Sequence, residues 1–131
     1  MKVAVIGSRG FTDYSVVKGY LDRLNEKREI TLIVSGGATG ADSLGARWAD
    51  DNGVQKLIHY AVWEDLTQPD ARIKVNAYGK QYDANAGFRR NKYIIDDSEI
   101  IIAFWDMRSP GTRNSIQYAK TKGKKLAIIK V

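Results

Sequence analysis

The sequence predicts an α/β protein built on a parallel β-sheet, and two observations support this fold class. Five short apolar runs, rich in β-branched and aliphatic residues, lack clean polar–apolar alternation, which is typical of strands covered on both faces. Between these runs lie segments whose apolar residues fall at helical spacing. Because alternating strands and helices form right-handed crossovers, we expect the strands to run parallel in one sheet.

The elements are expected in a fixed order along the chain. The apolar runs predict strands at Val3–Ile6, Thr31–Ser35, Gln55–Tyr60, Ile100–Trp105 and Leu126–Ile129. Of the four helical patterns, the first follows a capping residue, Asp13, the second ends at Asn52-Gly53, and the last ends at Gly123. The apolar residues that mark the helices are Val16, Val17, Tyr20, Leu21, Leu24, Leu44, Trp48, Ala49, Phe88, Tyr93, Ile94, Ile95, Ile116 and Ala119.

The chain of 131 residues is long enough for one hydrophobic core. We therefore predict a single three-layer domain of Rossmann-like type over residues 1–131. One segment fits neither pattern: Ala61 to Ala86 is too long for a simple connection and contains Pro69 and Gly79. Since long ordered loops in compact domains are often functional, we expect this segment to determine specificity or to form a subunit contact.

Composition excludes several classes of site. The chain has no cysteine and one histidine, His59, so disulfides, a catalytic thiol and a multi-histidine metal site are excluded. We expect no metal and no cofactor. No apolar run approaches the roughly 20 residues that a membrane span needs, so we expect a cytoplasmic protein with no membrane partner.

The net charge of +6 favours an anionic partner, either nucleic acid or a small phosphorylated ligand. Part of this charge lies near the end of the chain. We interpret these lysines as a solvated helix end and strand edge rather than as a DNA-binding patch: Lys120, Lys122, Lys124, Lys125 and Lys130.

Three glycine-containing loops follow predicted strands. In open α/β sheets ligands bind at the carboxyl ends of the strands, where glycines and helix N-termini expose backbone N–H groups to phosphate. Each residue taken singly also fits a turn or a helix cap, but three such loops on one rim favour an anion or nucleotide site. The residues predicted to bind there are Gly7, Ser8, Arg9, Gly36, Gly37, Thr39, Gly40, Asp106, Ser109, Gly111 and Thr112.

A fourth motif, Arg90-Asn91, follows a glycine at the start of the third predicted helix. Arginine offers a fork for phosphate and asparagine an amide for a sugar or base, although an exposed helix surface explains the pair equally well. The established phosphate motifs are absent. No GK[ST] follows the glycines, the first loop reads GxxG rather than GxGxxG, and no acidic residue ends the second strand.

The ordered set GSRGF, SGGATGAD, AGFRRN and FWDMRSPGT resembles the YspA/YpsA-related branch of the SLOG superfamily, which includes Smf/DNA-processing proteins and the Lonely guy enzymes. The resemblance covers essentially the whole chain. It implies a sheet of about five strands in the order 3-2-1-4-5 and a nucleotide-derived ligand at its rim. It also implies that the matching positions bind this ligand, Asp42 among them.

The sequence departs from the Lonely guy enzymes at one position. Their last loop, GGxGTxxE, ends in a catalytic glutamate, and the corresponding residue here is Ser115. We therefore lean against an enzyme and leave the catalytic residue unassigned. Asp106 could replace the glutamate as a general base or bind a ribose hydroxyl, and Glu64 could fold over the rim, whereas Asp42 is well explained as a first-turn helix acid.

Three functions remain in order of preference. The first is binding of a nucleotide-derived small molecule, such as a nucleoside phosphate or an ADP-ribose-related or NAD-related signal, by a sensor or sequestering protein. The second is a nucleoside-monophosphate N-glycosidase or phosphoribohydrolase. A nucleic-acid binder ranks last because the basic residues scatter or cluster near the end of the chain. The resemblance implies a homo-oligomer. Four aromatic residues either stack on a base or close the core: Trp63, Tyr78, Tyr82 and Trp105.

Overall fold

The structure is a computed structural model that describes residues 1–131. Five parallel strands form the main sheet in the order β3-β2-β1-β6-β7, and two short antiparallel strands, β4 and β5, form a separate hairpin. The elements are β1 (Lys2–Gly7), α1 (Tyr14–Lys27), β2 (Leu32–Gly36), α2 (Ala41–Asp51), β3 (Gln55–His59), β4 (Ile73–Val75), β5 (Gln81–Asp83), α3 (Ala86–Asp96), β6 (Ile100–Trp105), α4 (Pro110–Thr121) and β7 (Lys125–Lys130).

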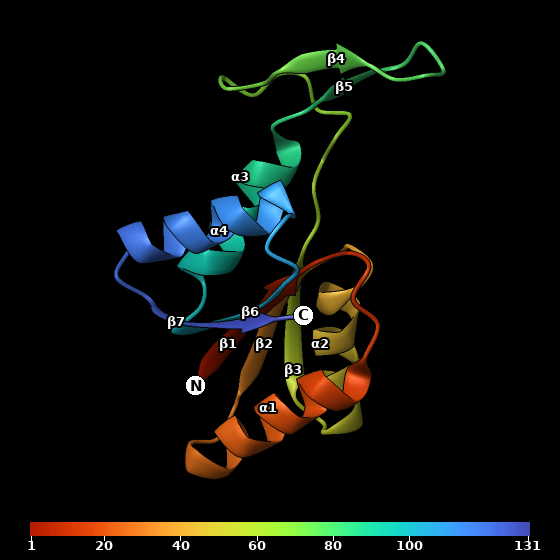
Figure 1. Cartoon of the computed structure of the whole chain (residues 1–131). Helices are drawn as coiled ribbons and strands as arrows, with labels where there is room; N and C mark the ends of the chain where they lie inside the picture. The colour runs from red at the N-terminus through yellow and green to blue at the C-terminus, as the bar shows by residue number, and fades with distance from the viewer.

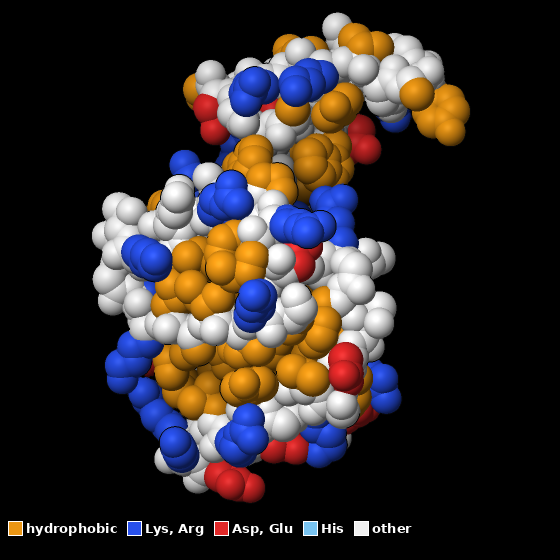
Figure 2. All heavy atoms as spheres, viewed as in Figure 1, with side chains coloured by type: hydrophobic (Ala, Val, Ile, Leu, Met, Phe, Trp, Pro, Cys, Tyr) orange, Lys and Arg blue, Asp and Glu red, His pale blue; other side chains and the backbone are white.

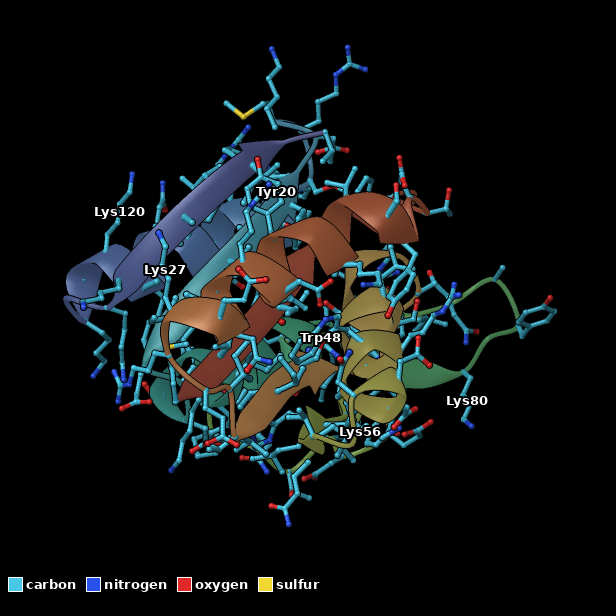
Figure 3. The ribbon with its side chains drawn as sticks, turned by 90° about the horizontal axis from the view of Figure 1, so that it is seen from below. Tyr20, Lys27, Trp48, Lys56, Lys80 and Lys120 are labelled. Atoms are coloured by element: carbon cyan, nitrogen blue, oxygen red, sulfur yellow. The ribbon has the colours of Figure 1, made fainter.

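Helices cover both faces of the main sheet and make three layers (Figure 1). On one face, Leu21 of α1 and Trp48 of α2 pack against sheet residues that include Val5 and Phe104. Trp48 lies between α1 and α2 (Figure 3), and its indole N–H donates to Asp22 Oδ1 at 2.9 Å. The buried polar group is thereby satisfied while the ring fills the core.

The opposite face is covered by α3 and α4. Ile94 and Ile95 of α3 and Ile116 of α4 pack against Ile101 and Ala103 of the central strand β6. The α/β class, the three layers and the strand order 3-2-1-4-5 are therefore confirmed. Predicted and observed strand ends differ by one residue at most.

The prediction of strands covered on both faces is wrong at the two edges of the sheet. Most side chains of β3 and β7 are exposed or half-buried, whereas β1, β2 and β6 are largely buried. The reason is geometric, since two helices on each face cover the centre of a five-stranded sheet better than its edges. Apolar residues such as Leu57 and Ile128 consequently reach the surface.

The segment Ala61–Ala86, predicted to be irregular, contains the β4–β5 hairpin. We call residues 72–83 the arm, because the hairpin projects from the body of the molecule (Figure 1). Strands of three residues are too short to show a periodic pattern, which is why the sequence did not reveal them.

The helices begin and end largely as expected. Asp13 caps α1, with its Oδ1 accepting the N–H of Ser15 at 3.1 Å. The lysines near the end of the chain lie on the last turn of α4, the loop after it and β7, which is where we expected a solvated helix end and strand edge. No helix combines the length and the apolar character needed to cross a membrane.

Candidate functional site

A cleft of about 460 Å³ lies at the carboxyl ends of β1 and β6, beside the first turns of α3 and α4. These two strands are neighbours at the point where the strand order reverses, which is where ligands bind in open α/β sheets. The predicted site residues that line the cleft come from four separate segments: Gly7, Arg9, Asp42, Arg90, Asn91, Asp106, Ser109, Gly111 and Thr112.

The remaining predicted residues lie beside or behind this cleft. Gly37 and Thr39 line a neighbouring cavity of about 300 Å³. Ser8, Gly36 and Gly40 do not line either of these cavities and instead pack against protein atoms. A role in ligand binding stays a prediction for these five residues and for those that line the cleft.

The glycines of the second loop let other parts of the site come together. A Cβ atom on Gly36 would lie 2.7 Å from Asp42 Oδ2 and 2.8 Å from Arg90 Nη1, so the missing side chain leaves room for both charged groups. Gly40 adopts a left-handed φ of +79°, and a Cβ there would collide with the carbonyl oxygens of Ser8 and Arg9. Close packing of the first and second loops therefore requires glycine at this position.

Arg90 is held in place by two acceptors. Its Nε donates to Asn91 Oδ1 at 2.9 Å and its Nη1 to the carbonyl oxygen of His59 at 3.5 Å. Burial lowers the pKa of Arg90 and the Asp42 carboxylate opposes that effect, but an arginine remains a cation in proteins. The Arg-Asn pair thus presents a positioned positive charge to the cleft.

Asp42 is the buried acid of the cleft, with 8% of its surface exposed. Burial raises the pKa of Asp42 to about 6, against the opposing effects of the Arg90 charge, the Ala38 N–H and the Arg9 charge. The carboxyl is therefore mostly ionised at pH 7 and becomes protonated just below that pH. Its charge offsets part of the positive charge of Arg90.

The loop between β6 and α4 is closed by Asp106. Its Oδ1 accepts the N–H groups of Ser109 and Arg108, both at 2.8 Å, and these bonds lower the pKa of Asp106 to about 2. Ser8 Oγ accepts the N–H of Asp106 at 3.0 Å and so ties the first loop to this one. A carboxylate of such low pKa is a poor general base at neutral pH, and the geometry favours a structural role for it.

The residue at the glutamate position of the Lonely guy motif also lines the cleft. The Ser115 hydroxyl is almost fully buried and donates to the carbonyl oxygen of Gly111 at 3.2 Å. Glu64, the other acidic candidate, lines a second cavity and not the main cleft. Neither Ser115 nor Glu64 therefore stands in for the glutamate in the main cleft, and the catalytic assignment stays open.

Arg9 and Trp63 connect the main cleft to its neighbours. Both residues line the main cleft, the cavity of about 300 Å³ and a second cavity of about 430 Å³ that reaches the arm. Arg9 makes no side-chain hydrogen bond or ion pair, so its guanidinium is available to a ligand. The three cavities are therefore neighbours that share two lining residues, and we call them together the groove.

The aromatic candidates separate into two groups. Trp105 belongs to the core, where its Nε1 donates to the carbonyl oxygen of Ser109 at 3.1 Å. Trp63 and Tyr82 line the groove, with ring centroids 6.4 Å apart in an edge-to-face arrangement, and Tyr78 lies at the tip of the arm. The sequence analysis missed Tyr60, which lines the groove and is 71% exposed.

Lys80 is a second residue of the groove that sequence reasoning missed. It lies on the arm at the edge of the molecule (Figure 3). No pattern around it pointed to the site, because only the hairpin brings it opposite the first loop.

Residues 1–66 match the family described as YAcAr: YspA, cpYpsA-related SLOG family. The Gene 61 protein of Mycobacterium phage D29 is 30% identical over 129 residues, which cover 93% of this chain and 90% of the phage protein. The match to the phage protein extends well beyond the residues matched by the family.

Two solved structures share the fold, and both are DNA processing protein A. The Streptococcus pneumoniae protein has a TM-score of 0.73 at 24% identity and matches 97% of this chain. The Helicobacter pylori protein, which binds single-stranded DNA, has a TM-score of 0.68 at 24% identity and matches 98%. The chain spans 49% and 64% of the lengths of these larger proteins.

These comparisons contradict our prediction of a free nucleotide-like partner and our ranking of nucleic acid as the last candidate. Both solved structures are of a DNA processing protein, and the one from Helicobacter pylori binds single-stranded DNA. The error came from judging the basic residues by their scatter along the sequence. The fold also brings Lys80 of the arm to the cavity that Arg9 and Trp63 line, which the sequence did not indicate. The predicted homo-oligomer stays a prediction.

Proposed function

The chain belongs to the YspA, cpYpsA-related SLOG family, and from this premise we propose that it binds single-stranded DNA along the groove. The observation that carries the proposal is the junction of three cavities at Arg9 and Trp63, one cation and one aromatic ring. A charged channel lined by stacking side chains is the arrangement that single-stranded nucleic acid binders use. The solved structure from Helicobacter pylori supports the same choice of ligand.

The phosphate backbone of the DNA binds in the main cleft. Arg9 and Arg90 supply charge, and the first turns of α3 and α4 expose backbone N–H groups at Gly87 and Gly111. Thr112 adds a hydroxyl group. These groups suit a phosphate of the DNA backbone, because they combine full charges with oriented dipoles.

The bases have their partners beside the cleft. Trp63 lines all three cavities, Tyr60 lines the third and Tyr82 the second. Every base has an aromatic face, so stacking on these rings tolerates any sequence. We propose binding without strong sequence preference and with marked dependence on salt concentration.

The test is the affinity for a fluorescent single-stranded oligonucleotide, measured by anisotropy over a series of salt concentrations. Arg9→Ala is the informative variant, since Arg9 is exposed and its side chain has no partner to lose. Losing a charged phosphate contact should weaken binding by about 2 kcal/mol. The slope of log affinity against log salt should fall by about 1.

Lys120→Ala is the matched control, because it removes the same charge from the end of α4 that lies away from the cleft. It should leave affinity almost unchanged. Equal losses in Arg9→Ala and Lys120→Ala would mean that net charge alone attracts DNA and would refute binding in the groove. Absence of binding by the unaltered protein at low salt would refute the proposed function itself.

A further inference from the structure

We propose that the arm is a second contact surface for the same DNA strand, so that the strand continues from the main cleft onto residues 72–82. This inference rests on the proposed function and adds to it the path of the strand. Contact with the arm makes affinity depend on the length of the DNA, since a short DNA strand occupies only the main cleft and does not reach the arm. Four observations on the arm support it.

The first observation is charge. The arm contains three cations, Arg72, Lys74 and Lys80, and one acidic residue, the buried Asp83, whose charge is paired with Arg89. None of these three side chains forms an ion pair within the protein. Cations that lack internal partners on a projecting hairpin suit an anionic polymer, and Figure 2 shows basic side chains along the arm.

The second observation is the exposure of large apolar side chains on so small an element. Tyr78 at the tip is 94% exposed, and Ile73 and Val75 are also exposed. Figure 2 shows hydrophobic side chains beside basic ones along the arm. The ring of Tyr78 does no packing in the protein, which leaves it free to stack on a base.

The third observation is that the arm is fixed to the cleft. Asp83 is fully buried, and its Oδ1 accepts the N–H groups of Asn85 and Arg72 at 2.9 and 3.0 Å. Arg89, next to the cleft residue Arg90, donates to Asp83 Oδ2 at 2.9 Å and also pairs with Asp70. Burial alone would raise the pKa of Asp83, but these hydrogen bonds hold it below its ordinary value.

The buried carboxylate therefore remains ionised and joins the base of the arm to the first turn of α3. Trp63 also joins the two elements, because it contacts both the base of the arm and the first turn of α3. Its carbonyl oxygen accepts the N–H of Asp83 at 2.7 Å, and its ring lies against Gly87, where a Cβ would be 3.0 Å away. An arm held in this way loses little freedom when a ligand binds.

The fourth observation is continuity. The second cavity, of about 430 Å³, is lined by Arg9, Trp63 and Glu64 together with residues of the arm, which are Asn76, Lys80, Gln81 and Tyr82. A strand whose phosphate contacts Arg9 in the main cleft can therefore reach Lys80 without leaving a concave surface. Hydrogen bonds order the tip of the arm, since Asn76 Oδ1 accepts the N–H groups of Tyr78 and Lys80 at 2.9 and 3.0 Å.

The experiment compares two labelled single strands of thymidine, of about 4 and about 12 nucleotides, within the range of known binding-site sizes. The variant is Lys74→Ala/Tyr78→Ala, which changes two exposed side chains of the arm that line none of the three cavities of the groove. For the longer strand we expect roughly tenfold or greater loss of affinity, from one lost stacking contact and one lost phosphate contact. Affinity for the shorter strand should stay the same.

Three controls complete the design. Arg9→Ala should weaken binding of both strands, because it acts in the cleft. Tyr78→Phe should bind the longer strand like the unaltered protein, because the ring is kept. Light scattering should give the double variant and the unaltered protein the same molar mass.

The outcomes separate the two proposals. Unchanged affinity of the double variant for the longer strand, or equal loss with both strands, overturns the role of the arm and leaves the groove intact. A changed molar mass together with lost affinity means that the arm is a contact between two copies of the chain, which also overturns it. If the unaltered protein binds neither strand, both proposals fail.

Discussion

Replacing Asp42 with asparagine should remove a pH-dependent loss of stability that burial imposes on this carboxyl. Asp42 lies in the cleft with 8% of its surface exposed, and burial raises its pKa from 3.8 to about 6. Each unit of difference between the folded and unfolded pKa corresponds to about 1.36 kcal/mol. A difference of about two units therefore amounts to about 3 kcal/mol.

The sign follows from the direction of the change. Below pH 3.8 the carboxyl is protonated in the folded and unfolded states and costs nothing. Between the two pKa values the folded protein binds more protons than the unfolded chain, so stability falls as the pH rises. Above about pH 6 the full cost of a buried charge is present. Carboxyls with lowered pKa, such as Asp106, act in the opposite direction.

The assay is urea unfolding of the unaltered protein and Asp42→Asn at several values between about pH 4 and pH 7. Opposing effects from other carboxyls are present in both proteins and cancel in the difference. Asparagine also removes the attraction between the Asp42 carboxylate and Arg90, but the pKa of about 6 already includes that attraction. The free energy of unfolding of the variant should gain about 2 to 3 kcal/mol relative to the unaltered protein across this range. Parallel profiles would refute the reasoning.

Two further predictions concern the cleft. Affinity for single-stranded DNA should rise a few-fold as the pH falls from about 7.5 to about 5.5, because protonation of Asp42 removes a negative charge beside Arg90. Anisotropy should show no such dependence on pH in Asp42→Asn. If affinity depends on pH equally in both proteins, Asp42 is excluded as the cause. Gly36→Ala should keep the fold and weaken DNA binding, since its Cβ displaces the free ends of Asp42 and Arg90. Gly7→Ala should instead lower the free energy of unfolding, measured in urea, by about 3 kcal/mol, because its Cβ meets the backbone carbonyl of Phe104, which cannot move aside. Similar losses of stability in Gly36→Ala and Gly7→Ala would contradict this difference between side-chain and backbone neighbours.

The central strands were predictable because burial selects their residues directly. Runs such as those in β1 and β6 are apolar at nearly every position, and the structure buries them between helices. The hairpin was not predictable, because β4 and β5 have three residues each and are anchored by Asp83 and Arg89 rather than by an apolar pattern. An ion pair between two residues produces no periodic pattern of apolar residues in a sequence.

Most of the cleft was also predictable, because the carboxyl ends of parallel strands meet at one rim. Arg9, Arg90 and Thr112 could be placed together before any coordinates were known, and they do line one cleft. The partner was ranked wrongly. Charge density depends on which cations meet in space, and Lys80 lines the groove only because of a hairpin that the sequence did not reveal.

The α/β class and the rim on which the glycine loops meet follow from the sequence, because apolar patterns and strand ends depend on residues that are close together in the chain. Only the folded chain shows that Gly36 leaves room for Asp42 and Arg90, that Asp106 closes its loop through hydrogen bonds, and that Lys80 and Arg9 line one cavity. Burial, pKa and the continuity of a surface depend on residues far apart in the chain. For that reason they appear only when the chain is folded.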